Sequence, residues 1–150
     1  MSASRGRALA AVLLVVATAT GCSGAVEVAV PDAASDPACA QAAAEWPTTI
    51  DGHDQVETDP ASPALRAWGD PAIIARCGVP ALTPTTDPCV GVNGVDWVAE
   101  DLSDGTRLTT YGRDPAIEVL VPSDYGSAAM IAVDFEKAAK ALPKNGHNCV

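Results

Sequence analysis

The apolar positions of residues 35–46 recur at the spacing of a helix. Asp36 can cap the free amides at its start, Pro37 suits the first helical position, and Pro47 ends the helix. One face of the helix carries apolar residues: Cys39, Ala42, Ala43 and Trp46. The pattern therefore predicts a helix that turns Cys39 toward a core.

A continuous apolar run follows in residues 72–79. Pro71 and Pro80 bound this run, which predicts a buried strand. The segment between the helix and this strand, residues 47–68, is rich in Asp-Gly, Asp-Pro and Ser-Pro pairs and is interpreted as turns.

Three strand-like segments come next, at 90–100, 106–112 and 116–122. Ser103-Asp104-Gly105 turns the first into the second, which predicts a three-strand antiparallel meander with one face on the core. Inside the first segment, Asn93-Gly94 indicates either a tight hairpin turn or a bulge within one strand.

The clearest periodic segment is 125–142, where a helix is predicted. Asp124 precedes it, and Lys137 and Lys140 lie near its end, as the helix dipole favours. Its apolar stripe consists of Tyr125, Ala128, Ile131, Ala132, Phe135, Ala138, Ala139 and Leu142. The order of elements predicts an α+β fold, in which both helices pack on one face of a small antiparallel sheet made of the meander and at least one further strand.

The N-terminus has the pattern of an export signal. Arg5 and Arg7 precede a short uncharged apolar run that is too short to span a membrane. Ala19-Thr20-Gly21-Cys22 resembles the bacterial lipobox, in which a diacylglycerol is attached to the cysteine before cleavage. We predict a signal peptide over 1–21 and lipidation of Cys22. The alternative is ordinary cleavage near Gly21 that leaves a free thiol.

Five cysteines support this interpretation, because an exported chain with an odd cysteine needs an explanation. If Cys22 carries the lipid, four cysteines remain in an oxidising compartment, which favours two disulfides. We favour Cys39–Cys77, between the first helix and the buried strand, together with Cys89–Cys149. Pairing of Cys77 with Cys89 is the main alternative.

Composition limits the size and the partners of the mature protein. Removal of residues 1–21 leaves one domain, predicted over 37–150, and changes the formal charge from −10 to −12 because it removes two arginines and no acid. Such an acidic surface is repelled by the phosphates of nucleic acid and by anionic lipids. Membrane attachment must therefore come from the acyl chains. Residues 22–36 are predicted to tether the domain to the lipid, although the alternating valines of 26–30 indicate an edge strand equally well.

Four segments in order resemble a known family: AWGDPAIIARCGV (67–79), VNGVDWV (92–98), TTYGRDPAIEVLVP (109–122) and the helix after it. They are similar to the actinobacterial secreted or lipid-anchored family called domain of unknown function 3515, over most of 37–142. The resemblance implies a location in the actinobacterial cell envelope and no particular reaction. It also implies the Cys39–Cys77 pair, whereas Cys89 and Cys149 are additional to the family pattern.

Charged residues in these segments have two interpretations. Arg76 and Arg113 can form a clamp for a carboxylate or phosphate ligand, such as a peptidoglycan stem or a lipid headgroup. The favoured interpretation pairs Arg76 with Asp70 or Asp96 as internal struts. Neither reading indicates a cofactor.

Aromatic residues also have two interpretations. Trp68, Trp97 and Tyr111 can line a shallow groove, but core filling is favoured in a chain with few aromatics. The acids of 100–106 lack the ligand order of a calcium loop, and the histidines and cysteines lack zinc-site spacing, so no metal is expected.

No nucleophile elbow or phosphate loop is found in the sequence. We therefore predict a lipid-anchored, non-enzymatic binding or accessory protein on the outer face of the cell membrane, with an envelope protein or a wall component as its partner. The alternative is a small envelope enzyme acting on wall precursors, with Asp70 or Asp96 acting together with Arg113.

Overall fold

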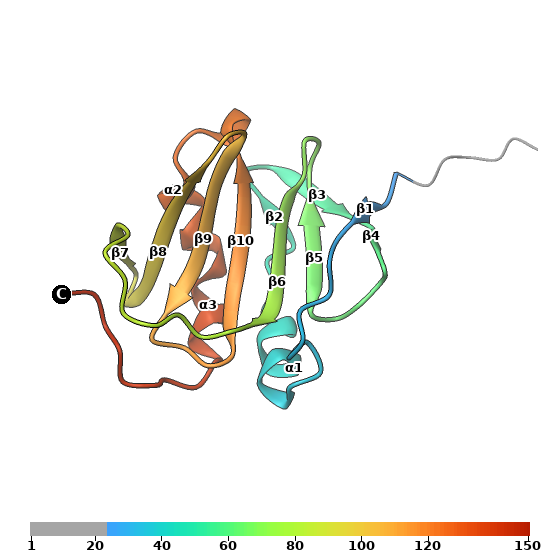
Figure 1. Ribbon diagram of the computed structural model, residues 1–150. Helices are drawn as coiled ribbons and strands as arrows, with labels where there is room; N and C mark the ends of the chain where they lie inside the picture. Colours follow the sequence, from blue (N-terminus) through green and yellow to red (C-terminus); the bar gives the residue numbers. More distant parts are fainter. Residues whose placement is uncertain (1–23) are drawn as a thin grey trace, which may run out of the picture.

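A computed structural model describes residues 24–150; the predicted signal peptide and Cys22 lie outside this range. Its centre is an antiparallel eight-stranded sheet with strand order β2-β3-β5-β6-β10-β9-β8-β7 (Figure 1). The strands are β2 Thr49–Ile50, β3 His53–Val56, β5 Leu65–Trp68, β6 Ile73–Val79, β7 Cys89–Val92, β8 Val95–Leu102, β9 Gly105–Tyr111 and β10 Ala116–Pro122. The α+β class with a small antiparallel sheet is confirmed.

The predicted meander is present and is one strand longer than expected. Asn93 and Gly94 both have positive φ, 52° and 79°, and form a two-residue turn between β7 and β8. Of the two alternatives for Asn93-Gly94, the tight hairpin turn is confirmed and the bulge is wrong, because this backbone geometry matches the twist of a tight hairpin. A second two-residue connection joins β8 to β9 and confirms the hairpin predicted at residues 103–105.

The prediction of turns alone for residues 47–68 is wrong. This segment holds β2, β3 and β5, as well as the short strand β4 Thr58–Asp59. Simple alternation fails to reveal β5, because Leu65 and Ala67 are buried on one face of the sheet and Trp68 is buried on the other. With Arg66 as its single polar residue and apolar residues on both faces, β5 lacks the regular alternation that marks a half-exposed strand.

The first helix, α1 Pro37–Ala43, begins as predicted. The Asp36 carboxylate accepts a hydrogen bond from the Ala38 N–H at 2.8 Å, which confirms the cap. Trp46 follows the helix, is buried, and donates its indole N–H to the carbonyl oxygen of Pro63 at 2.9 Å. The cap and the buried Trp46 thus fix the two ends of this segment.

The single helix predicted over 125–142 is instead a series of short helical pieces. They are η1 Ser123–Tyr125, α2 Ala128–Ala132, η2 Val133–Phe135 and α3 Glu136–Lys140. Gly126, with φ of 70°, separates η1 from α2, so Tyr125 lies outside the helical stripe. Ala128 is half-buried, and the remainder of the stripe is buried as predicted: Ile131, Ala132, Phe135, Ala138, Ala139 and Leu142.

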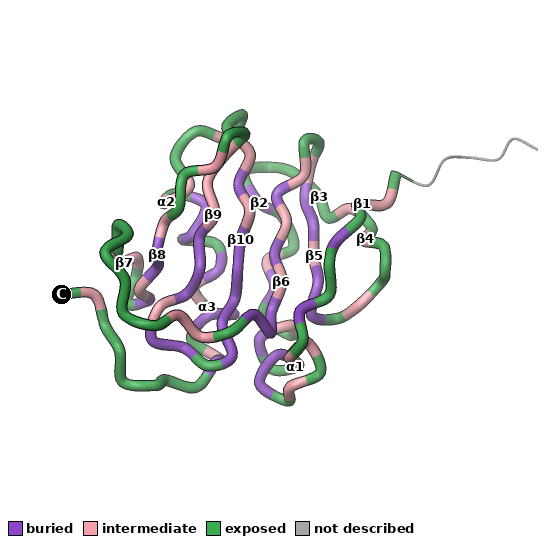
Figure 2. Tube along the Cα trace, viewed as in Figure 1, coloured by how far each residue is buried: buried purple, intermediate pink, exposed green. Residues whose placement is uncertain are grey.

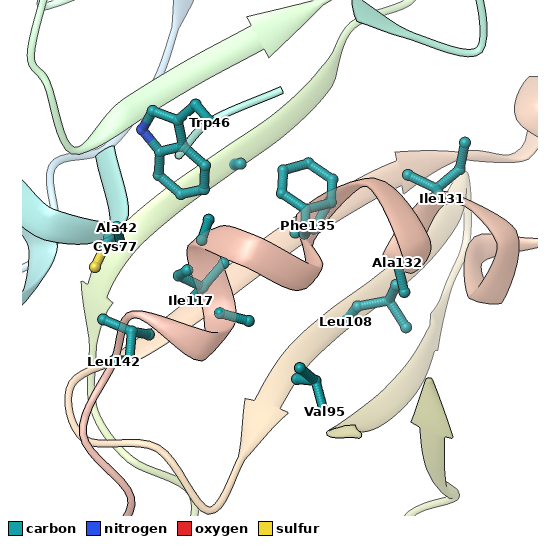
Figure 3. Close-up of a cluster of buried hydrophobic side chains, with 14 of the residues drawn as sticks. Ala42, Trp46, Cys77, Val95, Leu108, Ile117, Ile131, Ala132, Phe135 and Leu142 are labelled. Carbon is teal, nitrogen blue, oxygen red and sulfur yellow. The ribbon is translucent and has the colours of Figure 1, made fainter. Parts of the chain in front are cut away.

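The core lies between one face of the sheet and the helices (Figure 3). Phe135 is fully buried and meets Trp46 and Trp68 edge to face, with ring centroids 6.1 and 5.5 Å away. Figure 2 shows that β10 and β6, the central strands, are mostly buried, with half-buried residues near the end of β10 and in the first half of β6. The aromatic cluster joins the C-terminal helices to the sheet and to the segment after α1.

Residues 26–34, here called the N-terminal strap, run beside β5 on their way to α1 (Figure 1). Strand β1 Val26–Glu27 pairs in parallel with β4, so the strand alternative applies to these two residues. The Ala33 N–H donates to Gly78 at 3.2 Å, and a Cβ on Gly78 would come within 2.4 Å of the Ala34 nitrogen. Contacts with the domain therefore begin at Val26, before the boundary expected at residue 37.

Both favoured disulfides are present, Cys39–Cys77 and Cys89–Cys149. The first joins α1 to β6 inside the core, and both of its cysteines are buried. The second joins the start of β7 to the C-terminal tail and is more exposed. The alternative pairing of Cys77 with Cys89 is therefore excluded.

Candidate functional site

Four charged residues follow one another across the sheet on the face opposite the helices. Register places Glu118 of β10 beside Arg76 of β6, and Arg107 of β9 beside Glu100 of β8. Because side chains alternate between the two faces of a strand, these four project away from the helix-covered core. We call them the charged ladder.

Ion pairs connect the whole charged ladder. Arg76 Nε lies 2.7 Å from Glu118 Oε1, and Arg107 Nε lies 3.4 Å from Glu118 Oε2. Arg107 Nη1 donates to Glu100 Oε2 at 2.8 Å. The Glu118 side chain is only 9 % exposed, so the two guanidinium groups beside it, more than solvent, compensate its negative charge.

Residues 80–88, here called the groove loop, cross from the end of β6 to β7 along the lower ends of the neighbouring strands (Figure 1). Between this loop and the sheet lies a groove of about 450 Å³, which we call the outer groove. Its lining is Val79, Pro80, Ala81, Leu82, Thr83, Thr85, Asp87, Val98, Glu100, Arg107, Thr109 and Glu118. The volume falls within the usual range for small-ligand sites.

Both ends of the groove loop are fixed by disulfides. Cys77 lies in β6 shortly before the loop begins, and Cys89 follows its last residue. The tail is held further by a hydrogen bond from the Cys149 N–H to Asp96 Oδ2 at 2.9 Å. A loop fixed at both ends loses less conformational entropy when a ligand orders it.

Of the residues singled out in the sequence, Arg76 belongs to the charged ladder. Its partner is Glu118, which neither interpretation named, and Arg76 Nη1 also donates to the Ala29 carbonyl oxygen of the N-terminal strap at 3.2 Å. Arg76 thus joins the strap to the sheet.

Arg113 contacts a different part of the molecule. It is buried, and its Nη1 donates to the Leu142 carbonyl oxygen at 2.8 Å. Burial lowers the pKa of the Arg113 guanidinium, and the negative charge of Asp96 offsets part of this shift. Asp96 accepts from the Cys149 N–H, so Arg113 and Asp96 both hold the C-terminal segment. Arg76 and Arg113 therefore contact separate elements.

The remaining residues predicted for a site are dispersed. Trp68 and Trp97 are fully buried in the core, and Trp68 donates its indole N–H to Pro47 at 3.1 Å. Tyr111 lies against His147, with ring centroids 5.8 Å apart. Asp70 is exposed, and its charge adds to burial in raising the pKa of Tyr125. None of these four lines the outer groove.

Sequence reasoning missed three members of the charged ladder: Glu100, Arg107 and Glu118. Glu118 interrupts the apolar residues Ile117 and Val119, and a charge in such a strand is a signal for a buried partner. The partner itself depends on strand register, because Arg76 lies 42 residues away in the chain.

A family model described as "Protein of unknown function (DUF3515)" matches residues 7–145. The chain belongs to the DUF3515 family. No match to the chain is found among curated proteins or among solved structures. The family match confirms the resemblance predicted for 37–142 and extends it toward both ends.

In this DUF3515 protein, residues 24–150 contain no group of three or more His, Cys, Asp or Glu side chains arranged to hold a metal ion. Within the same range no helix has both the length and the apolar character needed to cross a bilayer. The outer groove combines a ligand-sized volume with part of the charged ladder, and we develop it as the candidate site of this family member.

Glu118→Gln is expected to lower the free energy of unfolding of this DUF3515 protein by about 2 kcal/mol. The substitution keeps the shape of the side chain but leaves Arg76 and Arg107 without the buried carboxylate between them. Glu100→Gln is the matched control: it removes the other carboxylate held by Arg107, on a side chain that is 52 % exposed, and should cost less than about 0.5 kcal/mol. Urea unfolding measures both, and equal losses would contradict a structural role for Glu118.

Proposed function

We propose that the protein is a lipid-anchored, extracytoplasmic envelope protein that binds a partner or ligand in the outer groove without transforming it. The observation that carries this proposal is the outer groove itself, a ligand-sized hollow whose loop is fixed by a disulfide near each end. Its charged groups are held by one another, since Arg107 contacts both Glu100 and Glu118. Charges fixed in this way orient a ligand at little reorganisation cost.

Cysteine use supports the anchor. The two disulfides take four of the five cysteines in the sequence, and the fifth is Cys22 of the lipobox-like segment. A lipid on Cys22 accounts for that thiol and supplies the acyl chains that an acidic protein needs to stay at a membrane. Two structural disulfides also favour an oxidising compartment.

The anchor is tested in cells that produce the full chain or Cys22→Ala, grown with an alkyne-tagged fatty acid. We expect the tag on the unaltered chain in the membrane fraction and its absence from Cys22→Ala, which should be released. Equal labelling of both chains, or an unaltered chain recovered from the cytosol with its signal intact, would overturn the anchor.

Binding in the groove is tested with a photo-crosslinking residue in place of Leu82 on the groove loop. Irradiation of intact envelopes should give a discrete crosslinked product. The control position is Asp101, an exposed residue next to Glu100 in β8 that does not line the groove. Products that are the same at both positions, or absent at Leu82, would contradict the outer groove as a binding surface.

A further inference from the structure

The outer groove carries an excess of negative charge. Asp87, Glu100 and Glu118 line it, and Arg107 is the one basic residue among its lining residues. Arg76 compensates Glu118 from the neighbouring strand, which still leaves the groove with more carboxylate than guanidinium. The chain as a whole has a formal charge of −10, so the surrounding field has the same sign.

Two of these carboxylates have an oxygen left for a ligand. Glu100 uses Oε2 to accept from Arg107, and Asp87 uses Oδ2 to accept from the Thr85 hydroxyl at 2.8 Å. Within residues 24–150 no hydrogen bond reaches Glu100 Oε1 or Asp87 Oδ1, and both residues are exposed. The groove therefore offers carboxylate acceptors, which form their strongest hydrogen bonds with positively charged donors.

The apolar part of the lining narrows the class of ligand. Leu82 on the groove loop and Val79 and Val98 on the sheet give the groove an aliphatic wall. A chain of methylene groups can pack on such a wall while its charged end reaches polar groups. An ammonium group at that end has three N–H donors and no acceptor, which matches carboxylate oxygens and a threonine hydroxyl.

An anion fits the same groove poorly. It would meet three carboxylates, and Arg107 is already engaged by Glu100 and Glu118. The Nε atom of Arg107 is buried, so a ligand in the groove does not reach it without a shift of the side chain. The electrostatic balance thus opposes the carboxylate or phosphate ligand that the arginines suggested in the sequence.

We propose that the outer groove binds a primary ammonium group at the end of an aliphatic chain, with Glu100 and Asp87 as its acceptors. This inference rests on the proposed function and gives that binding site its ligand chemistry. Two sources can supply such a group: a free alkyl diamine and the side chain of a lysine-like residue in a peptide.

The test titrates three probes into the purified disulfide-bonded protein and follows backbone amide resonances by NMR. The probes are 1,5-diaminopentane, the blocked peptide acetyl-Gly-Lys-Gly-amide and the same peptide with an acetylated lysine side chain. We expect saturable shifts with the diamine, with the lysine peptide, or with both, at the amides of Ala81, Leu82, Thr83, Thr85, Val98 and Thr109. The acetylated peptide, which has lost the charge, should give none.

Substitutions assign the acceptors. Glu100→Gln combined with Asp87→Asn should weaken binding about tenfold, since charged hydrogen bonds are removed from an exposed site. Asp101→Asn removes one carboxylate charge at the neighbouring position of β8 outside the groove and should leave the affinity unchanged. Response to the diamine alone indicates a free amine as the source, and response to the peptide alone indicates a protein or peptide source.

No saturable shift with either amine, equal binding of the acetylated peptide, or equal losses in the two variants would overturn the proposal. These results are separable from failure of the proposed function. A crosslinked product at Leu82 without amine binding would preserve the groove as a binding surface and reject its ammonium chemistry. Amine binding by a protein that is found to carry no lipid in cells would preserve the ammonium chemistry of the groove and reject the lipid anchor.

Discussion

Replacing Cys39 and Cys77 together by alanine is expected to lower the free energy of unfolding by about 4 kcal/mol. The bond closes a separation of 38 residues, and chain-entropy arguments assign a closure of that length about this value. Both cysteines are buried in the core, where they join α1 to β6, so their removal also loosens packing around the helix. Guanidinium chloride unfolding of the oxidised proteins, followed by tryptophan fluorescence, measures the loss.

The second disulfide provides the control. Cys89–Cys149 closes 60 residues, so loop entropy alone assigns it a slightly larger effect. We expect Cys89→Ser with Cys149→Ser to cost less, about 2 kcal/mol, because Cys89 is exposed and Cys149 is only half-buried. A larger loss for this pair than for Cys39 and Cys77 would show that loop length, and not the attachment of α1, dominates.

Phe135→Ala is expected to cost about 4 kcal/mol of unfolding free energy, the usual loss when a buried phenylalanine is cut back to alanine. Its ring is fully buried and lies edge to face against Trp46, which follows α1, and Trp68 of β5. The cavity would open where the helices, the sheet and the segment after α1 meet. Thermal and denaturant unfolding measure the change. The wavelength of maximum tryptophan emission of the native protein should also shift, because both indoles lose a neighbour.

Phe135→Leu keeps an apolar side chain at the same place and should cost less than half as much. Met130→Ala controls for helix propensity and for position in the C-terminal helices, because the Met130 side chain is largely exposed. A loss with Phe135→Ala similar to that of Met130→Ala would contradict the placement of Phe135 at the centre of the core.

Local patterns predicted the elements whose signals are complete within a short segment. Pro71 and Pro80 bound β6, Asp36 caps α1, and turn residues separate β8 from β9 and β9 from β10. The two disulfides were predicted from the four cysteines that remain when Cys22 is set aside, and from the face of α1 that carries Cys39. In each case the deciding interaction lies close in sequence or limits the alternatives to a few.

The strands of residues 47–68 were missed because burial on both faces removed the alternation from β5, and because β2 and β4 are only two residues long. The apolar period predicts a C-terminal helix that begins too early, because Tyr125 fits the period although α2 begins at Ala128. The Tyr125 hydroxyl instead donates to the Pro71 carbonyl oxygen at 2.6 Å, and Gly126 breaks the chain direction after it.

The candidate site was the part least accessible to sequence reasoning. Arg76 was singled out, but Glu118, Arg107 and Glu100 become its neighbours only through the register of four strands. The outer groove needs in addition the path of a loop without regular structure, residues 80–88, over that sheet face. Local periodicity contains no information on either relation.

If Cys22 carries the proposed lipid, the N-terminal strap limits how far the domain can lie from the membrane. Val26 already donates its N–H to Glu57 at 2.8 Å, and it lies four residues after Cys22. Four residues cover at most about 14 Å when fully extended. With acyl chains on Cys22, the groove would therefore lie within about 55 Å of the lipid headgroups, the tether length plus one domain diameter of roughly 40 Å. The ammonium ligand that we propose would then have to be a component of that thin layer or diffuse into it.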